Sequence, residues 1–200
     1  MEFESASPSV VKSIRQRELL NGWLALYARA HALPQLLDYG SERLDEEKPD
    51  LVHYSIEAEL DPPRLTIQSE GTRMASAYGH SGKGRSLETY VGPRLAPFVM
   101  PVYYECVRRR LPVYAIADID DIYGRVVAYE RLLMPFGRDG VVTDVLASLK
   151  TICEDGGFEL KNLMRGNDTL PRQRLCVVID RELLHHLPGR LPLVDQIEFG

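Results

Sequence analysis

Three segments, PVYAIA at 112–117, VVAYERLLMP at 126–135 and VVTDVLASLKT at 141–151, follow one another with only short connections between them. Each segment is rich in β-branched and aromatic residues, which favour strands. The connections 118–124 and 137–140 contain Asp and Gly, which are typical of hairpin turns. The pattern therefore predicts an antiparallel meander of three strands.

A hairpin is predicted upstream of the meander. The segment 51–60 reads LVHYSIEAEL, and the segment 64–68 alternates between polar and apolar residues, as strands do. Between them, Asp61-Pro62-Pro63 forces a turn. Because the strands of both groups need paired neighbours, we expect the hairpin and the meander to form one five-stranded antiparallel sheet.

The stretch 7–30 is predicted to be an amphipathic helix. Ser7 followed by Pro8 is a typical helix start, and Trp23 and Leu24 belong to an apolar stripe along the helix. Either the chain's own domain or a second copy must cover this stripe. We expect a homodimer in which the helix buries part of the stripe, so Asp at both positions should separate the copies without unfolding the sheet.

Two more helices are expected between the hairpin and the meander. The segment 71–78 should form a short helix that stops at Gly79, and 93–110 has one apolar helical face. Because the expected strands and helices form separate groups along the chain, we predict an α+β domain with helices on one face of the sheet. We therefore divide the chain into an N-terminal helix and connector, a central domain and a C-terminal extension, at 1–48, 49–152 and 153–200. The extension contains a possible strand at 174–180 and a possible short helix at 181–187.

Composition narrows the range of functions. A chain of 200 residues with 44% hydrophobic and 26% charged residues is typical of one globular domain. A net charge of −5 argues against binding to nucleic acid, which needs many basic residues. The acidic N-terminus and the lack of long apolar runs predict a cytoplasmic protein without a membrane span. The three widely spaced cysteines, Cys106, Cys153 and Cys176, are expected to be reduced thiols.

Two blocks of sequence carry a family resemblance. The first is GTRMASAYG at 71–79, followed by GRSL at 84–87. The second is GR at 124–125 and YERLLMP at 129–135, then DG at 139–140 and DVL at 144–146. Both blocks resemble the PAS family, in particular small bacterial PAS proteins. The resemblance covers roughly residues 50–152, and the predicted order of strands and helices is also that of PAS domains.

The resemblance implies a non-catalytic sensory domain of signal transduction that acts through a downstream signalling protein. PAS domains enclose a small pocket that binds flavin, haem, a small organic molecule or nothing. The family's flavin adduct needs a Cys in an Asn-Cys-Arg motif, and 71–91 contains no Cys. Its haem-binding members often take a His from the long helix, and 93–110 contains none. His53 and His80 flank the expected pocket but are interpreted as ordinary hydrogen-bonded residues.

A small polar or aromatic organic molecule then remains as the expected ligand. Tyrosines would stack on it, and an arginine would pair with a carboxylate. These side chains could equally fill the core and form structural ion pairs. The candidate ligand-binding residues are Tyr54, Arg73, Tyr78, Tyr103, Tyr114, Tyr129 and Arg131.

Other chemistry receives little support from the sequence. The glycine-rich segment 79–84 lacks the Gly-Lys-Ser/Thr ending of a phosphate-binding loop, and the acids at 118–121 lack the spacing of a calcium loop. His185 and His186 are adjacent and would point in different directions on a helix, so no metal site is predicted. We predict no catalytic residues. A small enzyme or ligand carrier on a related α+β sheet is the alternative, because catalytic groups can converge from distant positions.

Overall fold

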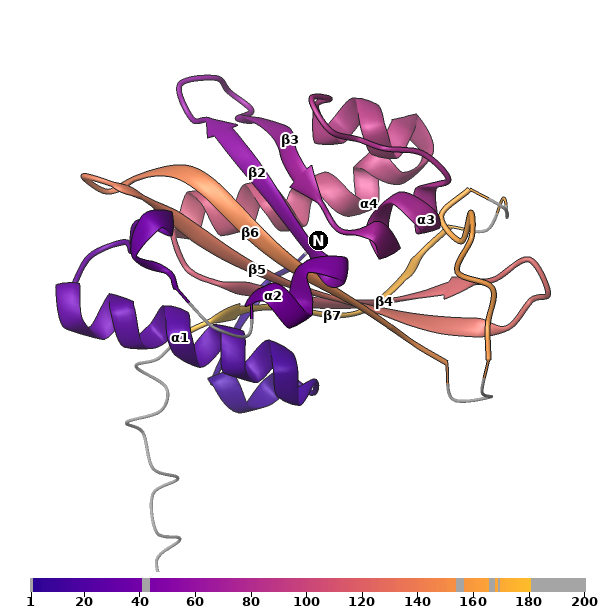
Figure 1. Ribbon diagram of the computed structural model, residues 1–200, viewed down its shortest axis with the longest axis horizontal. Coiled ribbons are helices and arrows are strands. Elements are labelled where there is room, and N and C mark those ends of the chain that lie inside the picture. Colours follow the sequence, from indigo (N-terminus) through magenta and orange to yellow (C-terminus); the bar gives the residue numbers. More distant parts are fainter. Residues whose placement is uncertain (1, 41–43, 154–156, 166–167, 169, 181–200) are drawn as a thin grey trace, which may run out of the picture.

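The computed structural model describes residues 2–40, 44–153, 157–165, 168 and 170–180. Its centre is a strongly twisted sheet of seven strands in the order β1-β7-β4-β5-β6-β2-β3 (Figure 1). The strands are β1 (Glu4–Ala6), β2 (Leu51–Glu57), β3 (Arg64–Glu70), β4 (Val113–Asp120), β5 (Val126–Arg138), β6 (Val141–Ile152) and β7 (Arg172–Ile179).

The predicted hairpin and meander are confirmed. β2 pairs with β3, and β4, β5 and β6 pair in sequence order, all antiparallel. The two groups meet where β2 pairs with β6, with Tyr54 opposite Val145. The α+β class is therefore correct, and so is the expected contact between hairpin and meander.

The predicted number of five strands is wrong, because both ends of the chain add to the sheet. β7 pairs antiparallel with β4, and β1 pairs parallel with β7, with Glu4 opposite Val177. The possible strand expected at 174–180 thus belongs to the main sheet. Strands from all three parts of the predicted division, 1–48, 49–152 and 153–200, share this sheet, and the helix expected at 181–187 lies outside the described residues.

Helices cover both faces of the sheet, which corrects the expectation of one covered face. α3 (Thr72–Tyr78) and α4 (Leu87–Arg109) pack on one face, and α1 (Ile14–Ala30) packs on the other (Figure 1). A short helix α2 (Leu44–Glu47) and 3₁₀ turns at Pro8–Val10, Leu36–Asp38 and Lys48–Asp50 complete the fold. The chain therefore has two apolar cores separated by the sheet.

The N-terminal helix begins later than predicted. Pro8 starts a 3₁₀ turn, and the α-helix begins only after Ser13, whose hydroxyl accepts a hydrogen bond from the backbone N–H of Gln16 at 3.4 Å. Trp23 is fully buried in the same chain, and its Nε1 donates to the carbonyl of Pro135 at 2.7 Å. Trp23 therefore fills the chain's own core rather than a contact between copies, while Leu24 is half-buried. A dimer through the rest of α1 stays a prediction.

The long helix contains a break that positions its two parts. Gly92 has φ 77° and ψ 169°, a conformation that suits glycine, and Pro93 follows it directly. The predicted start at residue 93 therefore corresponds to the second part of α4, which ends at Arg109. Leu87–Val91 forms an additional first part, with Ser86 as its N-cap.

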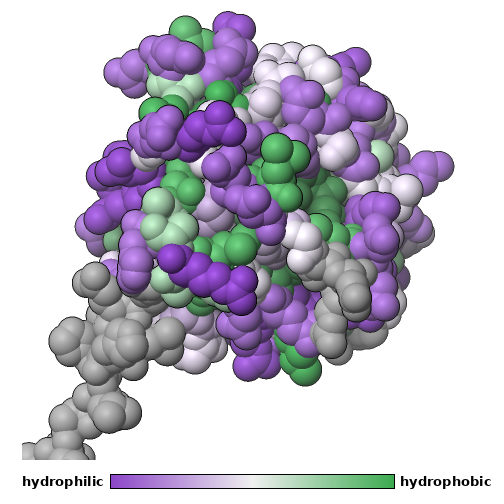
Figure 2. All heavy atoms as spheres, turned by 60° about the vertical axis from the view of Figure 1, so that its left-hand side comes forward, coloured by the Kyte–Doolittle hydropathy of each residue, from purple (hydrophilic) through white to green (hydrophobic). Residues whose placement is uncertain are grey.

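Among the described residues, no helix is long and apolar enough to cross a membrane. Figure 2 shows a face of the molecule on which hydrophobic residues form small groups framed by hydrophilic ones. Isolated apolar groups of this kind are normal on protein surfaces.

Candidate functional site

A cluster of tyrosines lies between the sheet and the helices α3 and α4. Tyr54 of β2 and Tyr103 of α4 are buried, with their hydroxyl oxygens 3.1 Å apart and their rings edge to face. Tyr78 of α3 packs against Tyr90 of α4 with 4.6 Å between ring centroids. Tyr129 of β5 directs its hydroxyl towards the sulfur of Met74 at 3.9 Å. The core beneath the two helices thus contains several hydroxyl groups.

Arg131 lies in this same core. Its side chain is 3% exposed, and its guanidinium carbon is 5.6 Å from the centroid of the Tyr129 ring, a cation–π contact. Its Nε and Nη1 atoms are buried without a hydrogen-bond partner among the residues that the structure describes. A guanidinium is a permanent cation with five N–H donors, so this is an unusual arrangement for a protein core.

The alternation of β5 explains why a neighbouring carboxylate does not neutralise Arg131. Successive side chains of a strand point to opposite faces, so Tyr129 and Arg131 face α4 while Glu130 faces α1. There Glu130 accepts a hydrogen bond from the hydroxyl of Tyr114 at 2.8 Å. On the α4 side, the carboxylate of Glu105 is engaged at the helix end.

The tyrosine hydroxyls cannot supply the missing negative charge. Burial raises the pKa of Tyr78, Tyr103 and Tyr129, and this outweighs the nearby positive charge of Arg131, which lowers it. The hydroxyls therefore stay protonated at neutral pH. Burial likewise raises the pKa of the Cys176 thiol to about 11, again against the effect of Arg131. The groups around the guanidinium are thus neutral.

A small cavity of about 10 Å³ adjoins this cluster, which is roughly the space of one water molecule. Tyr78, Tyr129 and Arg131 line it from α3 and the sheet, and Met164 lines it from the turn that follows β6. The backbone N–H groups of Asn162 and Met164 in this turn donate to α3, to the carbonyls of Ser76 and Ala77, at 2.9 and 3.0 Å. The side chain of Arg94 donates to the carbonyl of Met164 at 2.6 Å. The turn therefore closes the site by specific hydrogen bonds.

The structure brings together five of the seven predicted site residues: Tyr54, Tyr78, Tyr103, Tyr129 and Arg131. Tyr114 lies on the opposite face of the sheet, where its hydroxyl contacts Glu130. Arg73 is at the surface and pairs with Asp50 at 3.2 Å. These two residues therefore lie apart from the other five.

Two residues of the site were missed by the sequence analysis. Tyr90 belongs to the first part of α4, which the prediction left out. Ser86, a residue type that favours N-cap positions, is a signal that could have indicated this part. Met164 belongs to the C-terminal part of the chain beyond the region of resemblance. The sequence contains no local signal that would place Met164 over Arg131.

The other features singled out in the sequence have structural roles. In the glycine-rich segment 79–84, the N–H of Gly82 donates to the carboxylate of Glu70 at 2.8 Å, so the chain itself supplies the anion. Asp118 and Asp120 belong to β4, not to a turn, and pair with arginines of β7. His53 lies 2.7 Å from Asp144, while His80 contacts the carbonyl of Tyr78 at 3.0 Å. His185 and His186 lie outside the described residues.

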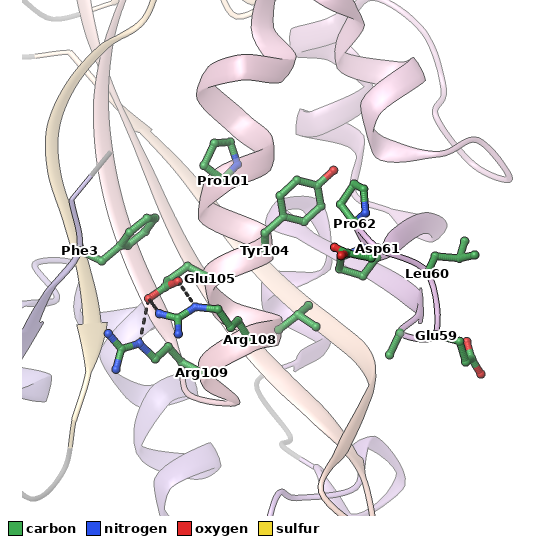
Figure 3. Close-up of a pocket in the computed structure, with 13 residues that line it drawn as sticks. Phe3, Glu59, Leu60, Asp61, Pro62, Pro101, Tyr104, Glu105, Arg108 and Arg109 are labelled. Carbon is green, nitrogen blue, oxygen red and sulfur yellow. Dashed lines mark hydrogen bonds and ion pairs between the residues drawn. The ribbon is translucent and has the colours of Figure 1, made fainter.

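A larger groove of about 810 Å³ lies at the surface, between the C-terminal part of α4, the tip of the β2–β3 hairpin and the chain before β1 (Figure 3). Phe3, Pro101 and Tyr104 contribute apolar surface. Glu105 accepts hydrogen bonds from Arg108 at 2.6 Å and Arg109 at 2.9 Å, so the charges on this wall are largely paired. The groove offers apolar contact area without a converging set of reactive groups.

Comparisons with known proteins give only distant similarity. No protein-family model matches the chain, and no curated protein sequence matches it. Among solved structures, a light-oxygen-voltage domain studied with a flavin analogue matches with 14% identity and a TM-score of 0.42, covering 57% of this chain and 84% of that one. The light-state structure of the blue-light photoreceptor Aureochrome1 LOV matches with 12% identity and a TM-score of 0.40, covering 58% and 91%. At these values the likeness does not indicate what this chain binds.

Proposed function

We propose that this chain is a PAS-type sensory module of signal transduction, and that its ligand-binding site is the core between the sheet and helices α3 and α4. The observation that carries the proposal is the buried Arg131, which has two nitrogens without a described hydrogen-bond partner beside a small cavity. Buried polar groups in folded proteins are almost always hydrogen-bonded, and buried charges are almost always paired. A ligand that enters the core would supply the missing partner.

The surroundings of Arg131 support binding rather than catalysis. Burial raises the pKa of the tyrosines of this core, so their hydroxyls are hydrogen-bonding groups and not bases at neutral pH. A permanently charged guanidinium does not act as a general base either. The alternative of a small enzyme would need groups whose pKa is shifted towards neutrality.

The site is connected to parts of the chain that can report its state. The turn with Met164 is held by α3, and Asp50 pairs with Arg73 of α3 on one side and with Lys150 on the other. Lys150 also pairs with Glu47, which pairs with Arg15 of α1 at 2.9 Å. A shift of α3 would therefore change ion pairs on both faces of the sheet. A downstream signalling protein, or a second copy in a cytoplasmic homodimer, would read this change.

Hydrogen–deuterium exchange with mass spectrometry tests the proposal. The full chain is incubated with a small-molecule extract of its source cells, and exchange is compared with that of the untreated protein. We expect slower exchange in α3, β5 and the turn at Met164, while the composition of the extract changes by no more than about one equivalent of ligand per chain. Repeated consumption of a compound would show turnover and contradict a sensory role, as would unchanged exchange in all three segments.

A further inference from the structure

We propose that the cavity beside Arg131 binds a small monovalent anion, of the size of a halide or a formate ion. This inference rests on the proposed function, because it names the class of ligand that the site takes. Three observations carry it: a buried guanidinium with two nitrogens that lack a described partner, neighbours that are neutral hydrogen-bond donors, and a cavity with space for one water-sized group.

Charge selects an anion. The guanidinium cannot lose its proton, and the described carboxylates nearest to it in the chain and on α4, Glu130 and Glu105, are engaged elsewhere. Its ring contact with Tyr129 compensates only part of the charge. A water molecule in the cavity would satisfy hydrogen bonds but would leave a net charge in the core. An anion would accept the hydrogen bonds of the guanidinium and would also neutralise its charge.

The neighbouring groups also suit an anion. Tyr78 and Tyr129 line the cavity together with Arg131, and a protonated hydroxyl can donate to an anion. Their high pKa keeps these protons in place at neutral pH. Most of the remaining wall is apolar, including Leu95, Val99 and Met164, and low polarity strengthens a charge-assisted hydrogen bond. Gln173 also lines the cavity, but its side-chain N–H groups donate to the carbonyls of Ile116 and Leu175.

The size of the cavity limits the ligand to a few atoms, and the single charge of the guanidinium is balanced by one negative charge. The cavity of about 10 Å³ holds roughly one water-sized particle. A halide is a single atom only somewhat larger than water, whereas a three-atom formate ion would require neighbouring side chains to move. Larger carboxylates such as succinate would require the turn at Met164 to leave α3, which would break its hydrogen bonds to Ser76 and Ala77.

The first test measures anion-dependent stability at constant ionic strength. The thermal unfolding midpoint of the full chain is followed while chloride, bromide, formate or succinate replaces gluconate, a six-carbon anion too large for the cavity. We expect the midpoint to rise with the logarithm of the chloride, bromide or formate concentration, and not with succinate. The Arg131→Met variant should bind about tenfold more weakly or not at all, because it loses charge-assisted hydrogen bonds. Arg138→Met, on the exposed end of the same strand, should respond like the wild type.

The second test does not depend on a variant that folds. Crystals of the wild-type chain grown in bromide should show an anomalous scattering peak within hydrogen-bond distance of the Arg131 guanidinium. Electron density for water only, without an anomalous peak, would overturn the inference, and so would equal anion responses in wild type and Arg131→Met.

The two proposals can fail separately. If a halide or formate binds at Arg131 while exchange in α3 and the turn stays unchanged, the anion site stands and the sensory function fails. If a neutral compound slows exchange in α3 and binds equally well to Arg131→Met, the sensory function stands and the anion site is wrong.

Discussion

The hydroxyl oxygens of Tyr54 and Tyr103 lie 3.1 Å apart and join β2 to α4 through the middle of the core. Both side chains are at most 1% exposed. In an apolar core, each hydroxyl depends on the other for its hydrogen bond. This pair therefore fixes the distance between the sheet and the long helix at the candidate site.

Removing one hydroxyl of the pair should lower the free energy of unfolding by more than the net contribution of one hydrogen bond. Tyr103→Phe leaves the Tyr54 hydroxyl buried without this partner, and we expect a loss of about 1–3 kcal/mol in the free energy of unfolding. The double variant with Tyr54→Phe should cost clearly less than the sum of the two single variants. Urea denaturation of the four proteins measures this coupling, and strictly additive losses would show that the two hydroxyls act independently.

A matched pair of glycine variants tests the closure of the site. Gly79 and Gly84 both have positive φ, at 74° and 79°, so alanine costs about 1–2 kcal/mol of backbone strain at either position. At Gly79 the added Cβ would overlap with Oδ1 of Asn162, whereas at Gly84 it would meet open space. We expect faster hydrogen exchange at the Met164 amide in Gly79→Ala only. Similar exchange in both variants would mean that the turn does not depend on its fit to α3.

Trp23 should contribute to the stability of the single chain, whatever its oligomeric state. We expect Trp23→Ala to lower the free energy of unfolding by about 3–5 kcal/mol, because it empties a fully buried position and removes the donor to Pro135. Ala25→Asp, at an exposed position of the same helix, is the control and should unfold like the wild type. Circular dichroism during urea denaturation gives both values. A Trp23→Ala chain with unchanged stability but altered oligomeric state would restore the idea of a contact between copies.

The buried ion pairs of Lys150 predict how stability responds to acid. Burial of Glu47 opposes its ionisation, but hydrogen bonds and charges from Lys150 and Arg15 outweigh burial and lower the pKa of Glu47 below its ordinary value of 4.5. Its contribution to stability is therefore present above pH 4.5 and is lost as the pH falls through the lowered pKa. In Lys150→Met this support is missing, so acid unfolding should begin at a higher pH.

Circular dichroism between pH 7 and pH 2 measures this shift. Lys48→Met is the matched control, because Lys48 is 72% exposed and pairs with Asp45 at the surface, where ion pairs contribute little. At pH 7 we expect Lys150→Met to lose about 3–5 kcal/mol, since two buried carboxylates lose their shared cation. An unchanged acid transition in Lys150→Met would show that these pairs do not stabilise the fold.

The sequence predicts well what depends on local pattern. Alternating residues and turn chemistry were sufficient for the hairpin at 51–68 and for the three strands between 112 and 151, because strand pairing there joins neighbours in the chain. The same alternation places Tyr129 and Arg131 on one face, and it would also have placed Tyr114 on the other. Nothing in the local sequence of Arg73 reveals that it pairs with Asp50, away from the tyrosine cluster.

What the sequence could not predict depends on contacts between distant segments. β1 has three residues, too few for a pattern, and its partner Val177 is 173 positions away from Glu4. Trp23 carries the pattern of an amphipathic helix, but the pattern does not say which surface covers it. The lack of a partner for Arg131 likewise becomes visible only when the whole core is assembled.

The pairing of β1 with β7 constrains how the chain can fold during its synthesis. Among the described residues, β1 takes its backbone partners from β7, which is not complete until residue 179 has left the ribosome. The nascent meander must therefore remain with one edge of β4 unpaired, while β1 stays without its partner strand. Such late, long-range pairing is slow and exposes strand edges to aggregation. One edge of the sheet is thus completed by two segments, 4–6 and 177–179, that are synthesised far apart in time.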